Sequence, residues 1–235
     1  MISKIFYMVL ENVLFLNSRI HIAFLRKKGV TIGEGTEFHG RVSIDYTRPS
    51  LVDIGRNCVF TDGDNLLTHG YDWAVLRENY GEMLSSSGKV IIGDNVFIGV
   101  NVIILKGVRI GKNSIIGAGA VVNRDIPAGS VATGNPCRVV MTLDEYYQKR
   151  KGVYTEEAKA YALEIYLKTK KVPRQDYFWE EFPLFLPRDG DWGELPVKRQ
   201  LGSAFNKFAN SKPLYASFKE FLIDAGIPRN EVEKA

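Results

Sequence analysis

The chain has 235 residues, of which 45% are hydrophobic and 25% charged, so it can bury a core of ordinary size and carry an appendage. The formal net charge of +4 is small and accompanies no nucleic-acid-binding motif, so we expect no nucleic acid partner. The cysteines Cys58 and Cys137 have neither disulfide-framework nor metal-ligand spacing, which indicates a reducing compartment, and we expect a cytoplasmic protein.

Residues 1–29 mix aliphatic and aromatic side chains with polar ones and end in the basic run 26–28 before Gly29. This pattern predicts an amphipathic helical segment that ends at Gly29. Its longest apolar run, residues 5–10, is far shorter than the roughly 20 residues that a membrane span needs. We expect its apolar face to cover the end of the core. The alternative is peripheral contact with the inner face of the membrane, with the basic run near lipid phosphates.

An aliphatic residue recurs at every sixth position in the middle of the chain. These leading residues are Ile92, Ile98, Ile104, Ile110, Ile116 and Val122, and the hexads continue as VNRDIP and AGSVAT over residues 122–133. A helix is excluded, because its apolar spacing is three and four. The residue after each leading one is glycine except at Leu105 and Asn123, so a second period of eighteen residues is present. Three hexads therefore make one coil with three short strands and three corners, and glycine or asparagine after the leading residue would supply the positive φ of two corners.

An earlier, less regular stretch keeps the same period. Its leading residues are Ile32, Phe38, Ile44, Ile54 and Phe60. Ten residues separate Ile44 from Ile54, so we expect residues 45–50 to form a small loop. After Leu66 the period is clear again only at Ile92, so residues 67–89 leave the coil and carry His69 with them. A loop of this length without its own core is usually functional.

The hexads, the segment THGYDW and the closing AGAVVNRDIPAGSVATGNPCRVV resemble the left-handed β-helix (hexapeptide-repeat) acyltransferases. The similar group includes xenobiotic acetyltransferases and the O-acetyltransferases of bacterial capsule and lipopolysaccharide synthesis. The resemblance implies a mainly β fold: a left-handed parallel β-helix over residues 30–140, a helical segment over 1–29 and a helical and loop extension over 141–235. It also implies a homotrimer with an active site at each of three interfaces.

The resemblance makes His69 the general base, and imidazole can take a proton from a hydroxyl group or an amine at neutral pH. The candidates for an acid that orients it are Asp62, Asp64, Asp72, Glu78 and Glu82, and the sequence does not choose among them. Further candidates for contact with the acceptor are Asn65, Asn101, Tyr71 and Trp73. Asparagine is equally suited to β-helix turns, and the two rings would serve a sugar, a hydrophobic antibiotic or packing between subunits.

Acetyl-coenzyme A is the cosubstrate that the resemblance implies. The residues assigned to it are Gly117, Ala118, Asn135, Pro136 and Arg138, with Lys106 and Arg124 as secondary candidates. Small side chains let backbone amides approach the pantetheine arm, and the Arg138 guanidinium offers donors to a phosphate. The histidines His21, His39 and His69 lack zinc-ligand spacing, so we expect no metal.

After Val140 the pattern becomes helical up to Pro173, then aromatic-rich and loop-like, with a last helix near residues 215–225. We expect this extension either to pack on the coil or to build an acceptor pocket. The sequence thus predicts an acetyl-coenzyme A-dependent acyltransferase that O-acetylates a sugar of a surface polysaccharide or its precursor by direct transfer. A xenobiotic acetyltransferase of the streptogramin or chloramphenicol type and a non-catalytic trimeric β-helix scaffold are the alternatives.

Overall fold

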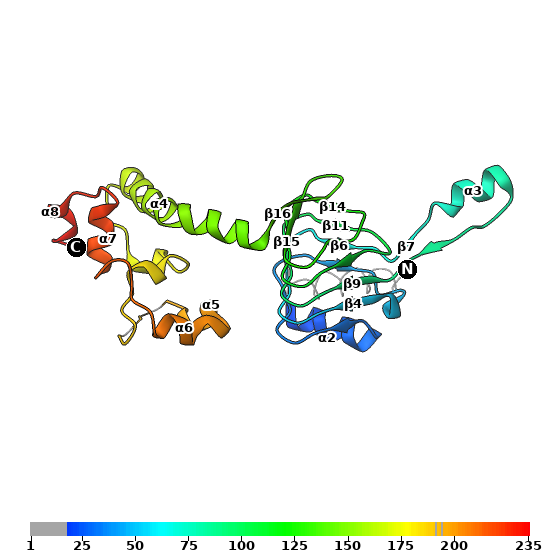
Figure 1. The fold of residues 1–235 in the computed structure, drawn as a ribbon, viewed down its shortest axis with the longest axis horizontal. Helices are drawn as coiled ribbons and strands as arrows, with labels where there is room; N and C mark the ends of the chain where they lie inside the picture. The colour runs from blue at the N-terminus through cyan, green and yellow to red at the C-terminus, as the bar shows by residue number, and fades with distance from the viewer. Residues whose placement is uncertain (1–17, 191, 194) are drawn as a thin grey trace, which may run out of the picture. The chain divides into compact units, whose positions relative to one another are not determined.

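The computed structural model describes residues 18–190, 192–193 and 195–235. The chain divides into two compact units, residues 1–147 and 148–235, each with its own arrangement of elements (Figure 1). The predicted N-terminal helical segment is seen from Ser18 onward, as α2 (Ser18–Lys28), and its residues 1–17 lie outside the described part of the chain. Ile22 and Leu25 of α2 are buried in the core of the coil, so this helix covers its end as expected.

Three parallel sheets form the three faces of the coil. The first face consists of β1 (Thr31–Ile32), β4 (Val52–Ile54), β9 (Val90–Ile92) and β12 (Arg109–Ile110). The second face consists of β2 (Glu37–Phe38), β5 (Val59–Phe60), β10 (Phe97–Ile98), β13 (Ile115–Ile116), β15 (Ser130–Thr133) and the antiparallel β16 (Arg138–Thr142). The third face consists of β3 (Ser43–Ile44), β6 (Asn65–Leu66), β11 (Ile103–Ile104) and β14 (Val121–Val122). The leading aliphatic residues are buried between these faces, as predicted.

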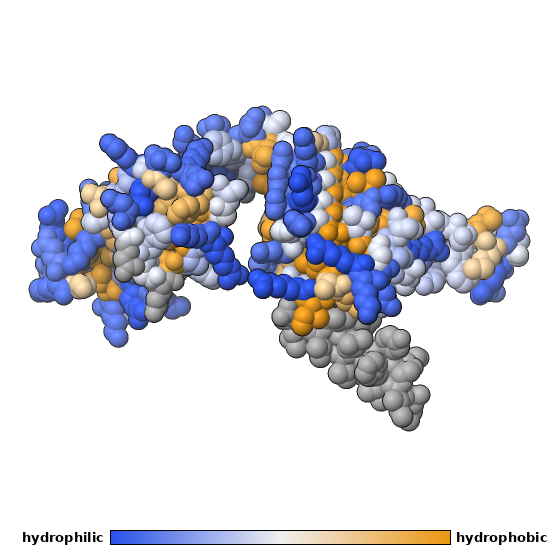
Figure 2. Space-filling view, turned by 90° about the horizontal axis from the view of Figure 1, so that it is seen from below, coloured by the Kyte–Doolittle hydropathy of each residue, from blue (hydrophilic) through white to orange (hydrophobic). Residues whose placement is uncertain are grey.

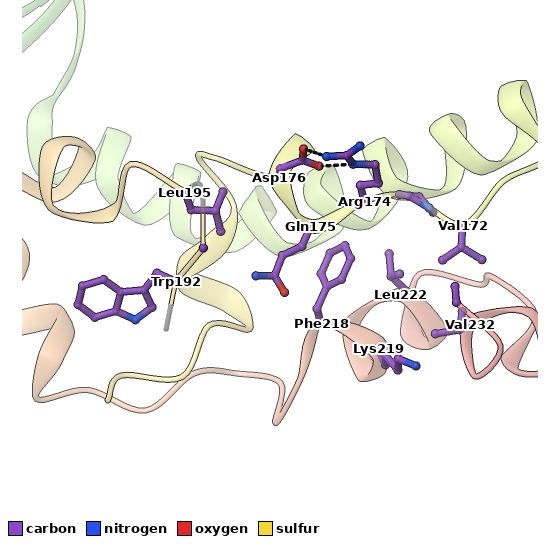
Figure 3. A pocket seen from close by; sticks show the side chains of 13 residues that line it. Val172, Arg174, Gln175, Asp176, Trp192, Leu195, Phe218, Lys219, Leu222 and Val232 are labelled. Atoms are coloured by element: carbon purple, nitrogen blue, oxygen red, sulfur yellow. Dashed lines mark hydrogen bonds and ion pairs between the residues drawn. The ribbon is translucent and has the colours of Figure 1, made fainter. Parts of the chain in front are cut away.

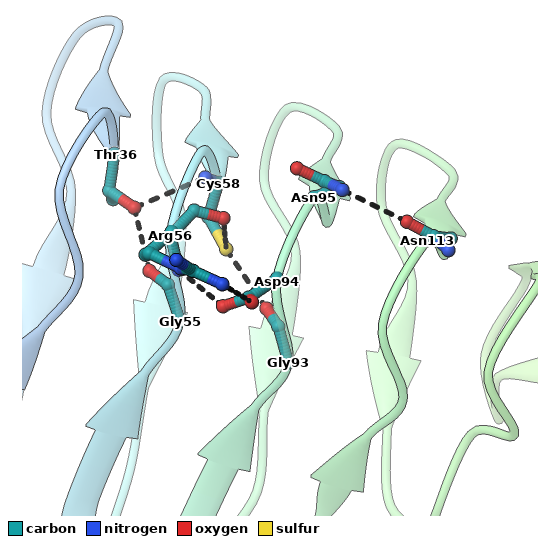
Figure 4. Close-up of polar contacts among 8 residues, drawn as sticks. All are labelled: Thr36, Gly55, Arg56, Cys58, Gly93, Asp94, Asn95 and Asn113. Carbon is teal, nitrogen blue, oxygen red and sulfur yellow. Dashed lines mark hydrogen bonds and ion pairs between the residues drawn. The ribbon is translucent and has the colours of Figure 1, made fainter.

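The corners differ from the prediction in one respect. Positive φ occurs three residues after the leading residue, at Asn95 (φ 57°) and Asn113 (φ 58°), and not at Gly93 or Gly111. The glycines are needed for close stacking instead: a Cβ on Gly111 would lie 2.3 Å from the backbone nitrogen of Ala128. The left-handed asparagines form a ladder in which Asn95 Nδ2 donates to Asn113 Oδ1 at 3.1 Å (Figure 4).

The predicted hexads after Val122 are also out of register by two residues. Ile126 pairs with Ile110 and Ala132 pairs with Ile116, so the buried position moves only four residues from Val122 to Ile126. The corner that follows β14 is therefore shorter than the others, and counting in sixes along the sequence cannot reveal this.

Each loop that leaves the coil has some structure of its own. The short loop contains the 3-10 helix η1 (Pro49–Leu51). The long excursion consists of β7 (His69–Gly70), α3 (Trp73–Tyr80) and β8 (Ser86–Ser87), and β7 and β8 pair as an antiparallel ribbon.

The second unit is helical around an aromatic core. Its elements are most of α4 (Leu143–Thr169), η2 (Gln175–Tyr177), η3 (Phe182–Leu184), α5 (Val197–Leu201), η4 (Gly202–Ala204), α6 (Phe205–Ala209), α7 (Phe218–Asp224) and α8 (Arg229–Val232). Its buried aromatic side chains are Phe178, Phe182, Phe185, Phe208 and Phe221. Among the described residues, none of the helices has the length and hydrophobicity that crossing a membrane requires.

Candidate active site

Two segments leave the coil at the same corner. Residues 45–50 follow β3 and residues 67–89 follow β6, and these strands are neighbours in the third face, with Ile44 opposite Leu66. Asp45 and Leu67 therefore begin their loops side by side at the corner that follows the third face, here called the third corner. This stacking brings Asp45 next to the β7 residue His69.

His69 is paired with Asp45 at the third corner. The imidazole Nδ1 lies 2.7 Å from Asp45 Oδ2, and the two side chains are only 14% and 10% exposed. Burial raises the pKa of Asp45, but hydrogen bonds from Thr47, Thr68 and His69 outweigh it and lower this pKa to about 2. A carboxylate accepts and cannot donate, so Nδ1 carries the proton and Nε2 presents its lone pair.

The acids proposed from the sequence are bonded to other groups or exposed, and none of the five is the partner of His69. Asp62 accepts the backbone N–H of Arg41, and Asp64 accepts the backbone N–H groups of Thr61 and Val102. Asp72 accepts Ser86 Oγ, Glu78 is paired with Arg77 on α3, and Glu82 lies exposed in the excursion. The expectation that one of these five orients His69 is wrong, because the carboxylate paired with the imidazole is that of Asp45, which lies in the preceding coil. The ten-residue gap after Ile44 was the available signal, since it marks a second loop at the same corner.

A groove of about 480 Å³ opens beside His69. Its lining residues are Leu67, His69, Gly70, Tyr71, Asp72, Leu105, Lys106 and Asn123. Tyr71 is 72% exposed and meets the imidazole edge to face, with ring centroids 5.2 Å apart. Trp73 follows at the start of α3, with its ring 6.2 Å from that of Tyr71. The groove thus combines a histidine with apolar, aromatic and charged walls.

The two candidate asparagines occupy structural positions. Asn101 has a φ of 59°, and its side-chain oxygen lies where a Cβ on Gly63 would be. Asn65 precedes a leading residue in β6, and its Nδ2 donates to the carbonyl of Gly63 at 2.7 Å. Both side chains therefore meet Gly63 of the second coil, Asn65 from the same coil and Asn101 from the next one, and neither lines the groove.

The candidate cofactor residues lie at two corners. Arg138 Nη1 donates to the carbonyl of Cys137 at 2.6 Å and reaches Asn123 Oδ1 at 3.5 Å, so it stands at the third corner that carries His69. Asn135 and Pro136 lie three and two residues before it and are exposed. Gly117 and Ala118 follow β13 of the second face, so one chain places them at a different corner.

A pocket of about 440 Å³ in the second unit contains none of the predicted site residues (Figure 3). Trp192, Phe218 and Leu222 form apolar parts of its wall, and Arg174 is paired with Asp176 at its edge. Among the described residues, no group of three or more histidine, cysteine, aspartate or glutamate side chains is arranged to hold a metal ion.

Comparison with known proteins agrees with this architecture. Residues 89–124 match the bacterial transferase hexapeptide family (six repeats). The chain is 34% identical to YvoF of Bacillus subtilis over 132 residues, 56% of this chain and 70% of that protein. It is 36% identical to Protein CapG of Staphylococcus aureus over 152 residues, 62% of this chain and 86% of that protein.

A sugar acetyltransferase is also among the similar proteins. The galactoside O-acetyltransferase of Escherichia coli is 35% identical over 126 residues, 52% of this chain and 61% of that protein. A structure of a galactoside acetyltransferase in complex with coenzyme A aligns over 58% of this chain and 78% of its own, with 29% identity and a TM-score of 0.44. The chain belongs to the hexapeptide-repeat acyltransferases, and both the left-handed parallel β-helix and the acetyltransferase class predicted from its sequence are confirmed.

Proposed function

We propose that this acetyltransferase transfers the acetyl group of acetyl-coenzyme A to a hydroxyl group of a saccharide, in a surface polysaccharide or its precursor, with His69 as the general base. The observation that carries the proposal is the His69–Asp45 pair at the wall of an open groove. A base must be rigidly held and still face a bulky acceptor, and the corner of a coil meets both conditions.

The reaction needs one proton to move twice. Asp45 accepts a hydrogen bond from Nδ1–H, so the lone pair on Nε2 takes the proton of the acceptor hydroxyl as that oxygen attacks the thioester carbonyl. The tetrahedral intermediate then collapses, the carbon–sulfur bond breaks, and the protonated Nε2 returns the proton to the departing thiolate. No covalent bond to the protein is required.

A saccharide acceptor agrees with the walls of the groove. The exposed Tyr71 ring offers an apolar face, and the Asn123 side chain offers amide atoms to hydroxyl groups. The similarity to a galactoside O-acetyltransferase supports the same class of acceptor.

We further propose a homotrimer. Hydrophobic residues reach the surface of the coil (Figure 2), and the exposed ones include Phe97 at 41% and Val100 at 44%. A neighbouring subunit would cover them and would bring its Gly117 and Ala118 toward the third corner. At that corner Arg138 would bind a phosphate of coenzyme A. The site of action that we propose is the cytoplasm, where acetyl-coenzyme A is available.

The test replaces His69 with alanine and measures acetyl transfer to a panel of saccharides. His69→Ala should lower kcat roughly 10²- to 10⁴-fold, the usual contribution of a general base, and leave the coenzyme A dissociation constant unchanged. His39→Ala is the matched control, because His39 is half exposed and paired with Glu37 on the second face. Near-normal transfer by His69→Ala would remove His69 from the mechanism, and transfer to chloramphenicol or a streptogramin in preference to every saccharide would replace the acceptor class.

A further inference from the structure

The arm, defined as residues 71–85, projects from the coil on a narrow base. The β7–β8 ribbon at its base has two paired positions, His69 with Ser87 and Gly70 with Ser86. The helix α3 at its tip has no buried residue, and Tyr80 and Met83 are 74% and 63% exposed. Burial within the chain therefore contributes little to holding the arm, although the arm supplies Tyr71 and Asp72 to the groove.

A chain of polar contacts connects the arm to the next coil. Lys106, two residues after β11, donates from Nζ to Ser86 Oγ at 2.7 Å. Ser86 Oγ in turn donates to Asp72 Oδ1 at 3.1 Å. The Lys106 ammonium group is thus linked to Ser86, where the chain returns to the coil, and through Ser86 to Asp72, where the chain enters the arm.

Gly70 provides the space in which these groups meet. A Cβ on Gly70 would lie 2.5 Å from Asp72 Oδ1 and 3.4 Å from both Lys106 Nζ and Ser86 Oγ. Its φ is outside the left-handed region, so the backbone would accept an alanine and only the polar contacts would be disturbed.

We propose that Lys106, Ser86 and Asp72 form a latch that fixes the base of the arm, and with it Tyr71, at the wall of the His69 groove and thereby sets the affinity for the acceptor. The three residues act through the arm and are positioning residues. His69 itself is held by Asp45, so opening the latch moves one wall of the groove while the base stays in place. The kinetic part of this proposal rests on the proposed acetyl transfer, and the structural part does not.

The structural test is cleavage by an arginine-specific protease. Arg77 lies within α3, so a protease can cleave after it only when the arm loses its folded form, and mass spectrometry of the fragments measures how often this happens. Lys106→Met, Ser86→Ala and Gly70→Ala should each accelerate this cleavage about 2- to 10-fold, the net contribution of one intramolecular hydrogen bond between exposed groups. Lys112→Met and Gly152→Ala are the matched controls, because Lys112 is exposed at another corner and a Cβ on Gly152 would meet nothing within 4 Å.

The kinetic test uses the same variants. Opening the latch should raise KM for the saccharide acceptor by a similar factor, with a smaller fall in kcat and no change in KM for acetyl-coenzyme A. The double variant Lys106→Met/Asp72→Asn should be no worse than the more affected single variant, because both substitutions break one chain of contacts.

Two results would overturn the latch. One is unchanged Arg77 cleavage in both Ser86→Ala and Gly70→Ala, which change small side chains and preserve the charges. The other is full additivity in the double variant. A complete lack of acetyl transfer by the wild-type protein would instead refute the proposed function, and the cleavage rates would still decide whether the latch exists.

Discussion

Asp45 determines what His69 can do. It receives hydrogen bonds from Thr47 and Thr68 as well as from the imidazole, so its charge is satisfied although the side chain is 10% exposed. With a pKa of about 2, it is ionised at neutral pH, and in the neutral imidazole it fixes the tautomer that exposes the Nε2 lone pair.

Asp45→Asn should therefore impair catalysis without removing the base. Its amide can donate to Nδ1 and stabilise the opposite tautomer, in which Nε2 carries the proton and cannot accept another. We expect kcat to fall roughly 10²- to 10⁴-fold, with coenzyme A binding retained in a calorimetric titration. A kcat within threefold of wild type would show that the pair is not used in the reaction.

Asp64 is the second informative carboxyl group, because it is 2% exposed at a position where neighbouring coils have valine or alanine. Burial raises its pKa to about 7, and this effect outweighs the hydrogen bonds from Val102 and Thr61 that lower it. The folded state therefore holds the proton more tightly than the unfolded chain. This stabilisation is complete below about pH 4 and disappears as the pH rises through 7.

The pH dependence of unfolding tests this assignment. Between pH 4 and pH 7 the free energy of unfolding of the wild-type protein should fall, by at most about 4 kcal/mol from this group. Asp64→Asn should flatten the dependence, as measured by urea denaturation at several pH values. The same slope in both proteins would mean that another group is responsible.

At the scale of the element, the glycine after each leading residue decides how closely the coils stack. The Cβ positions built at Gly93, Gly99 and Gly111 all lie within 2.7 Å of a backbone nitrogen in the next coil. Backbone atoms cannot move aside as the end of a flexible side chain can, so an added methyl group must push the coils apart.

Gly111→Ala should consequently destabilise the coil by about 1–3 kcal/mol, although alanine is conformationally acceptable there. Gly152→Ala within α4 is the control, and we expect it to be neutral or stabilising by up to about 1 kcal/mol. Urea unfolding followed by circular dichroism measures both. Equal stability of Gly111→Ala and wild type would show that the coils can separate without cost.

At the scale of the whole molecule, the proposed trimer depends on the outward apolar residues of the coil. Phe97→Asp would place a charge in the subunit interface, where it would be desolvated without a partner. We expect light scattering to give three times the chain mass for wild type and a smaller mass for Phe97→Asp. Val153→Asp on α4, where Val153 is 38% exposed, is the control and should not change the mass. A wild-type monomer at micromolar concentration would refute the trimer.

The sequence by itself determined the coil. Its buried residues recur at every sixth position, and its glycines return to the same corner after eighteen residues. The parallel pairing of the strands preserves both spacings. It also determined that residues 67–89 leave the coil with His69. It misplaced the positive φ, since asparagine and glycine suit both a left-handed corner and a close approach, and the spacing does not separate the two uses.

Only the tertiary structure decided which acid serves His69. Asp45 stands 24 positions earlier, and it reaches the imidazole because two loops of different length leave the same corner of successive coils. The latch has the same origin, since Lys106 meets Ser86 across 20 positions of chain. Nearness to His69 in the sequence favoured Asp62, Asp64 and Asp72. A coil instead brings residues one turn apart into contact and places the residues between them on its other faces.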